Sequence, residues 1–180
     1  MVSSSNIPGA QLALSVDPSS KGFAFVVLEN GLLVDWGVRR VRSNMNRDSV
    51  RKLRALIQRY KPDILVFEDT HHRSSRRGSR VRRLLGQFAR EAHAHGVMVK
   101  KVTQREVQGR FGAYPGRQLT KHRIALALAD KFPELWEHLP RVRKLWMSED
   151  ERMNIFDALA MALVATNFHE VSSEERPQVA

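Results

Sequence analysis

Five short apolar segments, separated by turns or by helical segments, limit what this 180-residue chain can fold into. The first three follow one another closely, at residues 11–17, 22–29 and 32–42, and Asn30-Gly31 lies between the second and the third. This dipeptide is preferred in a two-residue hairpin because both of its positions tolerate positive φ. The sequence therefore predicts that the chain opens with a three-stranded antiparallel meander.

Helices and strands are expected to alternate after the meander. Residues 48–60 carry an apolar face at helical spacing, and residues 63–68 and 97–102 have the pattern of strands on either side of a helix over 79–95. A helix between two strands favours a right-handed crossover and parallel pairing. We expect an α/β domain whose mixed five-stranded sheet, three antiparallel strands plus two parallel ones, is flanked by helices.

The C-terminal third is expected to be mostly helical. A helix is predicted over residues 119–132, followed by an irregular segment over 133–147. Ser148 and Glu151 fit a capping box, in which each side chain accepts from the other residue's backbone N–H. We therefore expect the last helix to begin at Ser148 and to continue to about residue 168.

Composition and length exclude several classes of protein. The sequence has no cysteine, which rules out disulfides and thiolate metal sites and fits a reducing compartment. No apolar run approaches the roughly 18 residues of a membrane span, and the N-terminus lacks the features of a signal peptide. We expect a cytoplasmic protein without a membrane partner, in which residues 10–169 form one domain between disordered segments at 1–9 and 170–180.

The charge of the chain indicates a polyanionic partner. Thirty basic residues stand against 19 acidic ones, and the net charge of +11 favours binding to nucleic acid. Residues 71–110 alone hold eleven basic and two acidic residues, although a solvated surface would be the simpler interpretation. Arginine binds phosphate bidentately, so we expect nucleic acid to contact the arginines that follow the fourth strand, namely Arg73, Arg76, Arg77, Arg80 and Arg83.

Three acidic residues lie where apolar residues would be expected. Asp17 ends the first strand, Glu68 ends the fourth strand, and Asp157 lies in the apolar last helix, on the same predicted helical face as Asp150 and Asn154. A buried carboxylate must be paired, neutralised or bound to a metal. If the first and fourth strands are parallel neighbours, their last residues meet at one edge of the sheet.

Oxygen ligands of this kind suit magnesium. Mg²⁺ prefers carboxylates, water and phosphate oxygens, and two ions can activate a water and stabilise a leaving oxygen. We therefore expect two Mg²⁺ ions, for which Mn²⁺ can substitute. An unrelated helix cap, strand-end turn and ion pair would be the alternative interpretation. The expected ligands are Asp17, Glu68, Asp157, Asn154 and Asp150.

The order and spacing of these residues resemble those of a known nuclease family. The segments Val16-Asp17-Pro18-Ser19, Phe67-Glu68 and Asn154-Ile155-Phe156-Asp157-Ala158-Leu159-Ala160 resemble RuvC, the Holliday junction resolvase of the RNase H-like superfamily, and the resemblance spans roughly residues 11–168. It implies an RNase H-like fold and a homodimeric, Mg²⁺-dependent endonuclease of DNA recombination and repair that cuts four-way junctions.

The resemblance also assigns roles to single residues. Asp17, Glu68 and Asp157 match the catalytic acids of the family, and Lys121 matches a basic residue that touches the scissile phosphate and binds nucleic acid. A further family aspartate falls on Asn154, which brings no negative charge and would weaken the second metal. A RuvC-like RNA-processing nuclease and a catalytically weakened branched-DNA-binding module therefore remain alternatives. An actin-like ATPase would need a second domain for which 180 residues leave no room.

Overall fold

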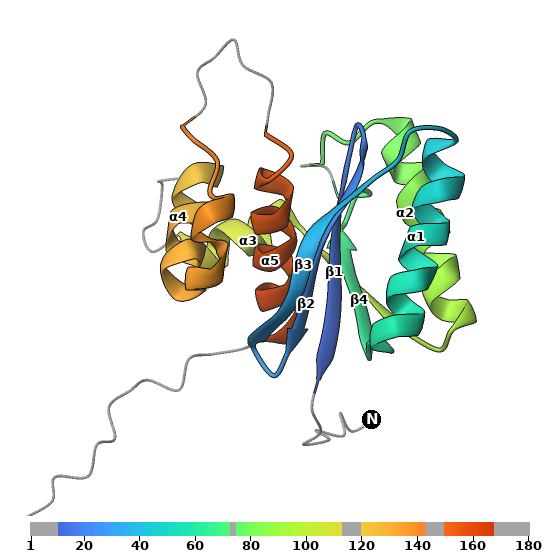
Figure 1. The fold of residues 1–180 in the computed structure, drawn as a ribbon, viewed down its shortest axis with the longest axis horizontal. Coiled ribbons are helices and arrows are strands. Elements are labelled where there is room, and N and C mark those ends of the chain that lie inside the picture. The colour runs from blue at the N-terminus through green and yellow to red at the C-terminus, as the bar shows by residue number, and fades with distance from the viewer. Residues whose placement is uncertain (1–10, 73–74, 113–119, 143–149, 168–180) are drawn as a thin grey trace, which may run out of the picture.

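A computed structural model of the protein describes residues 11–72, 75–112, 120–142 and 150–167. Its five strands form one mixed sheet in the order β3-β2-β1-β4-β5 (Figure 1). β1, β2 and β3 pair antiparallel, whereas β1 pairs with β4, and β4 with β5, in parallel. The predicted mixed sheet is therefore confirmed. The strands are β1 Leu12–Ser19, β2 Gly22–Glu29, β3 Leu32–Arg40, β4 Ile64–Glu68 and β5 Met98–Val102.

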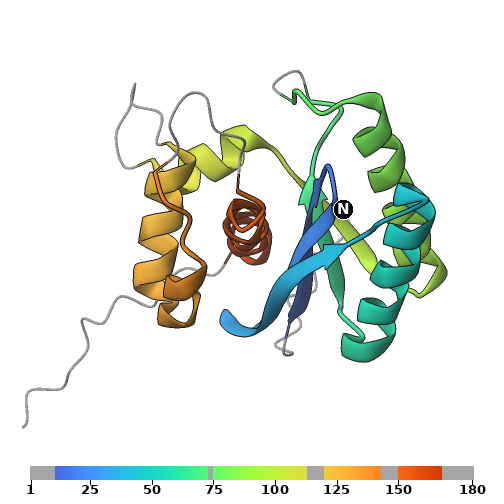
Figure 2. The same cartoon turned by 45° about the horizontal axis from the view of Figure 1, so that its top comes forward.

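Helices cover both faces of the sheet, which gives three layers (Figures 1 and 2). α1 and α2 lie on one face, and α5 packs on the other face with α3 and α4 beside it. The helices are α1 Met45–Tyr60, α2 Ser79–Ala94, α3 Gln104–Phe111, α4 Lys121–Lys131, the 3₁₀ helix η1 Pro133–His138 and α5 Met153–Thr166.

Local sequence explains the hairpin and the two cores. Asn30 and Gly31 both have positive φ, 50° and 77°, as the predicted tight turn requires. Successive strand side chains point to opposite faces. Leu14 and Val16 therefore pack under α1 and α2, whereas Ala13 and Val66 face α5. The sheet thus separates two apolar cores.

α5 is buried on almost every side. Eleven of its 14 residues are buried, and they pack against the sheet and against α4. A helix that is apolar all round belongs in the interior of a protein. The unusual polar residues of this helix, Asn154 and Asp157, therefore lie at a place where a polar side chain needs a specific partner.

Two predicted helix starts are wrong. α5 begins at Met153 and not at Ser148, because the Asp150 carboxylate accepts from the Arg152 backbone N–H at 2.9 Å and closes a turn outside the helix. Residues 143–149, including Ser148, lie outside the described residues. α1 begins at Met45, three residues before the predicted start. Asp150 therefore does not share a helical face with Asn154.

One segment expected to be irregular is helical. η1 occupies the first part of the predicted irregular segment because Pro133, with its fixed φ, suits the first position of a helix. The termini that were expected to be disordered, 1–9 and 170–180, lie outside the described residues. Among the residues that the structure describes, none of the helices has the length and apolar character needed to cross a bilayer.

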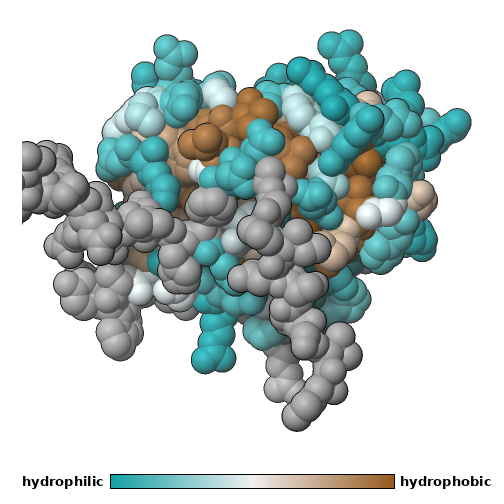
Figure 3. Space-filling view, turned by 90° about the horizontal axis from the view of Figure 1, so that it is seen from below, coloured by the Kyte–Doolittle hydropathy of each residue, from teal (hydrophilic) through white to brown (hydrophobic). Residues whose placement is uncertain are grey.

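Apolar side chains are exposed at the end of the molecule where β1 begins. Figure 3 views this end and shows brown residues gathered between hydrophilic ones. Leu32 and Met98, at the starts of β3 and β5, are 72% and 64% exposed. The acids that end β1 and β4 lie at the opposite end of the sheet.

Candidate active site

The last residues of β1 and β4 bring two carboxylates together. These strands are parallel neighbours, with Ser15 aligned to Val66, so Asp17 and Glu68 lie two residues further along at the same edge. Both side chains are buried, with 2% and 5% of their surface exposed. Ser15, Val66 and both acids occupy alternate positions that face α5. The predicted proximity of Asp17 and Glu68 is therefore confirmed.

Arg77 joins these two acids. Its Nε donates to Glu68 Oε2 at 2.6 Å, and its Nη2 forms a short ion pair with Asp17 Oδ1. Its Nη1 donates to the Pro18 carbonyl at 2.9 Å. The planar guanidinium suits this role because its donors form a rigid fork that matches carboxylate oxygens. Arg77 therefore supplies the positive charge that the two buried carboxylates need.

α4 and α5 complete the site with a second ion pair. α5 packs on β1 and carries Asp157, whose Oδ2 lies 2.7 Å from Nζ of Lys121. Lys121 is the first residue of α4, which begins where the Thr120 side chain accepts from the Arg123 backbone N–H. The structure therefore brings together all four residues predicted to be catalytic.

The four groups interact electrostatically. Burial raises the pKa of Asp17 to about 7, and the nearby negative charges of Asp157 and Glu68 raise it further, whereas Arg77 and Lys121 act to lower it. Burial acts to lower the pKa of Arg77, but the carboxylates of Asp17 and Glu68 outweigh it and raise that pKa. Arg77 therefore keeps its charge, and Asp17 is the member of the pair that titrates.

Asn154 lies one turn before Asp157 and lines the same hollow as Asp17. The hollow has a volume of about 350 Å³, and Asn154 itself is only 8% exposed. Glu151 also lines it and forms ion pairs with Lys21 at 3.2 Å and Arg40 at 2.9 Å. The other lining residues are Pro18, Ser19, Ser20, Arg77, Arg80, Val81 and Lys121.

The predicted metal ligands are not gathered into a ready-made metal site. Within the described residues, no three histidine or acidic side chains are grouped closely enough to hold an ion. Arg77 separates the oxygens of Asp17 and Glu68, and Lys121 contacts Asp157. Asp150 pairs with Arg152 at 2.6 Å. The ligand roles of all five residues therefore stay predictions.

The arginines predicted to bind nucleic acid have different surroundings. Arg76 and Arg83 are exposed, whereas Arg77 points inward to the acids. Arg80 lines the hollow and donates from Nη2 to the Ser19 carbonyl at 2.9 Å. Arg73 lies outside the described residues. Binding of nucleic acid by this set stays a prediction.

Sequence reasoning missed two features of the site. Arg77 was grouped with surface arginines because nothing in an arginine-rich loop marks one member as the partner of buried acids. Glu151 was interpreted only as half of a capping box, yet it lines the hollow between two basic side chains. A weak signal for Glu151 was its place three residues before Asn154, near the start of an apolar helix.

Comparison with known proteins rests on the fold. No family model and no curated protein matches the sequence. The Thermus thermophilus RuvC structure is similar with a TM-score of 0.60 and 17% identity, over 86% of this chain and 92% of that chain. The yeast mitochondrial Holliday junction resolvase is similar with a TM-score of 0.62 and 13% identity, over 89% of this chain and 79% of that chain.

This chain has the RuvC fold. The RNase H-like sheet of RuvC, with three antiparallel strands extended by two parallel ones, is the sheet observed here. A structure of Thermus thermophilus RuvC in complex with a Holliday junction substrate is also similar, with a TM-score of 0.59 and 18% identity, over 86% of this chain and 91% of that chain. At these identities the likeness establishes the RuvC fold, and function must be argued from the site.

Proposed function

We propose that this protein is a metal-dependent endonuclease that hydrolyses phosphodiester bonds in four-way or otherwise branched DNA. The observation that carries the proposal is the meeting of Asp17, Glu68 and Asp157 at one edge of a RuvC-type sheet in a strongly basic protein. Burial of three acids at one place is costly for folding, and a catalytic use explains why the chain retains them.

The donor chemistry fits a divalent cation. Carboxylate oxygens of Asp17, Glu68 and Asp157, with the amide oxygen of Asn154, are hard ligands of the type that Mg²⁺ and Mn²⁺ take. When bound, such an ion supplies positive charge for the phosphate and lowers the pKa of a coordinated water. Arg77 and Lys121 now neutralise the same acids, so metal loading requires Arg77 to withdraw from Asp17 and Glu68.

Basic side chains beside the acids would position the substrate. Lys121 and Arg80 both line the hollow that Asp17 lines, so either can reach a phosphate held there. An arginine that leaves a carboxylate can bind a phosphate oxygen with the same donors. The exposed Arg76 and Arg83 extend the positive charge beyond the hollow. Together these residues would hold the strand while the acids act on the scissile phosphate.

A branched substrate and a homodimer follow from the same proposal. One of the similar structures is described as RuvC in complex with a Holliday junction substrate, and another as a Holliday junction resolvase. A four-way junction has two equivalent strands to cut, and two copies of this chain related by a two-fold axis would present one site to each. We therefore propose that the active form is a homodimer.

A catalytically weakened binding module is the second candidate. Asn154 favours it, because this residue lines the hollow beside Asp17 but brings no charge to a second metal ion. An RNA-processing nuclease has no observation of its own in the structure. It is separated from the leading proposal by substrate alone.

Cleavage of a labelled panel tests the proposal. The panel holds a four-way DNA junction, a flap, a linear duplex and an RNA hairpin, each with Mg²⁺ or Mn²⁺. We expect the wild-type protein to cut the junction, and we expect Asp17→Asn, Glu68→Gln and Asp157→Asn each to lower the rate by at least 100-fold while junction binding persists. The exposed Asp130→Asn serves as the control and should cut normally.

The outcomes separate the candidates. Junction binding without cleavage by any metal would support the binding module, and cleavage of the RNA hairpin alone would support the processing nuclease. Full activity in one of the three variants would remove that acid from the mechanism.

A further inference from the structure

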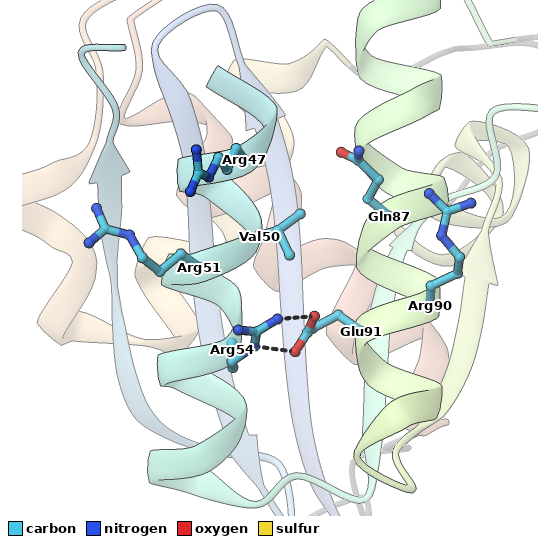
Figure 4. Close-up of a pocket in the computed structure, with 7 residues that line it drawn as sticks. All are labelled: Arg47, Val50, Arg51, Arg54, Gln87, Arg90 and Glu91. Carbon is cyan, nitrogen blue, oxygen red and sulfur yellow. Dashed lines mark hydrogen bonds and ion pairs between the residues drawn. The ribbon is translucent and has the colours of Figure 1, made fainter. Parts of the chain in front are cut away.

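A second hollow, away from the acids, lies between α1 and α2 on the face of the sheet opposite to α5 (Figure 4). We call it the arginine groove. Its volume is about 550 Å³, against about 350 Å³ for the hollow at the acids. The groove is lined by Arg47, Val50, Arg51 and Arg54 from α1 and by Gln87, Arg90 and Glu91 from α2.

The positive charge of this groove is not neutralised by the protein. Glu91 is already committed to Arg54, which donates to it from Nε at 2.6 Å and from Nη2 at 3.0 Å (Figure 4). Arg51 has only Asp48 at 3.6 Å. Within the described residues, Arg47 and Arg90 form no ion pair or hydrogen bond, and both are exposed. Like charges held close together repel one another, so the groove favours an anion.

The arginine groove begins at the edge of the sheet that carries the acids. α1 follows the end of β3 and α2 follows the end of β4, and both of these strand ends lie at that edge. Asn46 Nδ2 donates to the Arg80 carbonyl at 3.4 Å, and Arg80 lines the hollow beside Asp17. From Arg47 to Arg54 the helix advances about 10 Å. The arginines therefore form a track that leads away from the candidate active site.

We propose that the arginine groove binds the phosphate backbone of a nucleic-acid arm that leaves the active site. Arginine offers two donors to one phosphate, and a track along two helices can follow successive phosphates without reading bases. A second copy of this chain fits the groove less well, because it would set arginine against arginine across a shared axis. The inference rests on the proposed function, since its ligand is an arm of the same substrate.

The salt dependence of binding tests the inference. The test variant combines Arg47→Gln, Arg51→Gln and Arg90→Gln, leaves the Arg54–Glu91 pair intact, and is titrated with a labelled four-way DNA junction at several salt concentrations. Each lost phosphate contact lowers the slope of log K against log salt by about 0.9. We expect the slope to fall by about one to three, while cleavage at saturating DNA keeps the wild-type rate.

A matched variant controls for net charge. It combines Arg59→Gln, Lys61→Gln and Lys131→Gln, which remove three positive charges at the C-terminal ends of α1 and α4. We expect this variant to keep the wild-type slope within about 0.5. An equal fall of the slope in both variants, or no fall in the groove variant, overturns the inference.

Two further measurements close the remaining routes. A variant with lysine at positions 47, 51 and 90 should keep most of the slope, because lysine retains the charge that releases counterions. A changed molecular mass of the glutamine variant in light scattering would show an interface between copies and overturn the inference. If the wild-type protein cuts no substrate but the groove variant still loses slope, the proposed function fails and the groove stands. If it cuts junctions and the slope is unchanged, the reverse holds.

Discussion

Arg77 holds the centre of the candidate site because its guanidinium contacts both strand-end acids and the Pro18 carbonyl. Removal of one partner of a buried ion pair leaves the other charge unpaired, which costs more than the pair itself contributes. The same position is the one that a divalent ion would take between Asp17 and Glu68. Arg77 therefore has opposite effects on folding stability and on metal affinity.

Arg77→Gln should separate these effects. We expect the variant to lose roughly 3 kcal/mol of unfolding free energy in chelator, because two buried carboxylates lose their shared cation. It should also bind Mn²⁺ more tightly in a calorimetric titration, because no guanidinium competes for the oxygens. Arg80→Gln is the matched control, since Arg80 contacts the Ser19 carbonyl and should change neither quantity much. Equal metal affinity of the wild type and Arg77→Gln would contradict the competing role.

Asp17 gives the protein a pH dependence with a defined sign. Burial raises its pKa from 3.8 in the unfolded chain to about 7, so the folded state holds this proton more tightly. The stability that this proton contributes is fully present below about pH 4 and is lost as the pH rises through about 7. Ionised Asp17 is therefore a liability for folding at neutral pH.

Asp17→Asn should remove that liability. In urea unfolding with chelator, we expect the variant to gain stability relative to the wild type as the pH is raised from 4 to 8, with the smallest difference at the acidic end. The exposed Asp130→Asn is the control and should show a flat difference over this range. A wild-type advantage that grows towards pH 8 would mean that the Arg77 pair outweighs the cost of burial.

At the scale of single elements, α5 is the most demanding part of the fold. It packs against the sheet on one side and α4 on the other, so its small side chains set how closely these layers approach. Ala158, Ala162 and Ala165 are each at most 2% exposed. The helix also fixes where Asp157 lies relative to β1 and Lys121. Packing of α5 and geometry of the site are therefore linked.

Ala162→Leu should expose this link. Three extra carbons have no space in a closely packed interior, so we expect a loss of about 1 to 3 kcal/mol of unfolding free energy. The same substitution at the exposed Ala127 of α4 is the control and should change stability by less than about 0.5 kcal/mol. Both can be measured by thermal unfolding. Equal stability of the two variants would show that α5 has room to move.

At the scale of the whole molecule, charge and apolar surface are segregated. The acids, Arg80 and the arginine groove lie towards one end of the sheet, whereas Leu32 and Met98 are exposed at the other end (Figure 3). A polyanion would therefore approach from the end at which β1 and β4 finish. Symmetric action on two strands needs two such ends, held in a fixed relation.

The proposed homodimer can be tested by mass. One chain weighs 20.6 kDa, so light scattering should give about twice this mass for the protein bound to a four-way junction, after subtraction of the DNA. The control is the same measurement with a linear duplex of equal length. A single chain per junction at full cleavage activity would contradict the homodimer.

Local patterns carried much of the sheet. Alternating apolar residues and Asn30-Gly31 predicted the meander, because strand periodicity and turn chemistry are properties of neighbouring residues. Helix starts were less predictable: Asp150 could cap a helix or close a turn, and only its contact with Arg152 decides between them. In the same way, α1 starts at Met45 although Asp48 and Ser49 are both good capping residues.

The sequence by itself determined that the strand-end acids Asp17 and Glu68 share one edge, since parallel strands that end together place their last residues side by side. Only the tertiary structure decided which cation lies between them. Arg77 is nine residues from Glu68 and 60 from Asp17, and the choice of this arginine over its neighbours depends on how the loop, β1 and α2 come together in space. Long-range electrostatics of this kind leaves no periodic trace in a sequence.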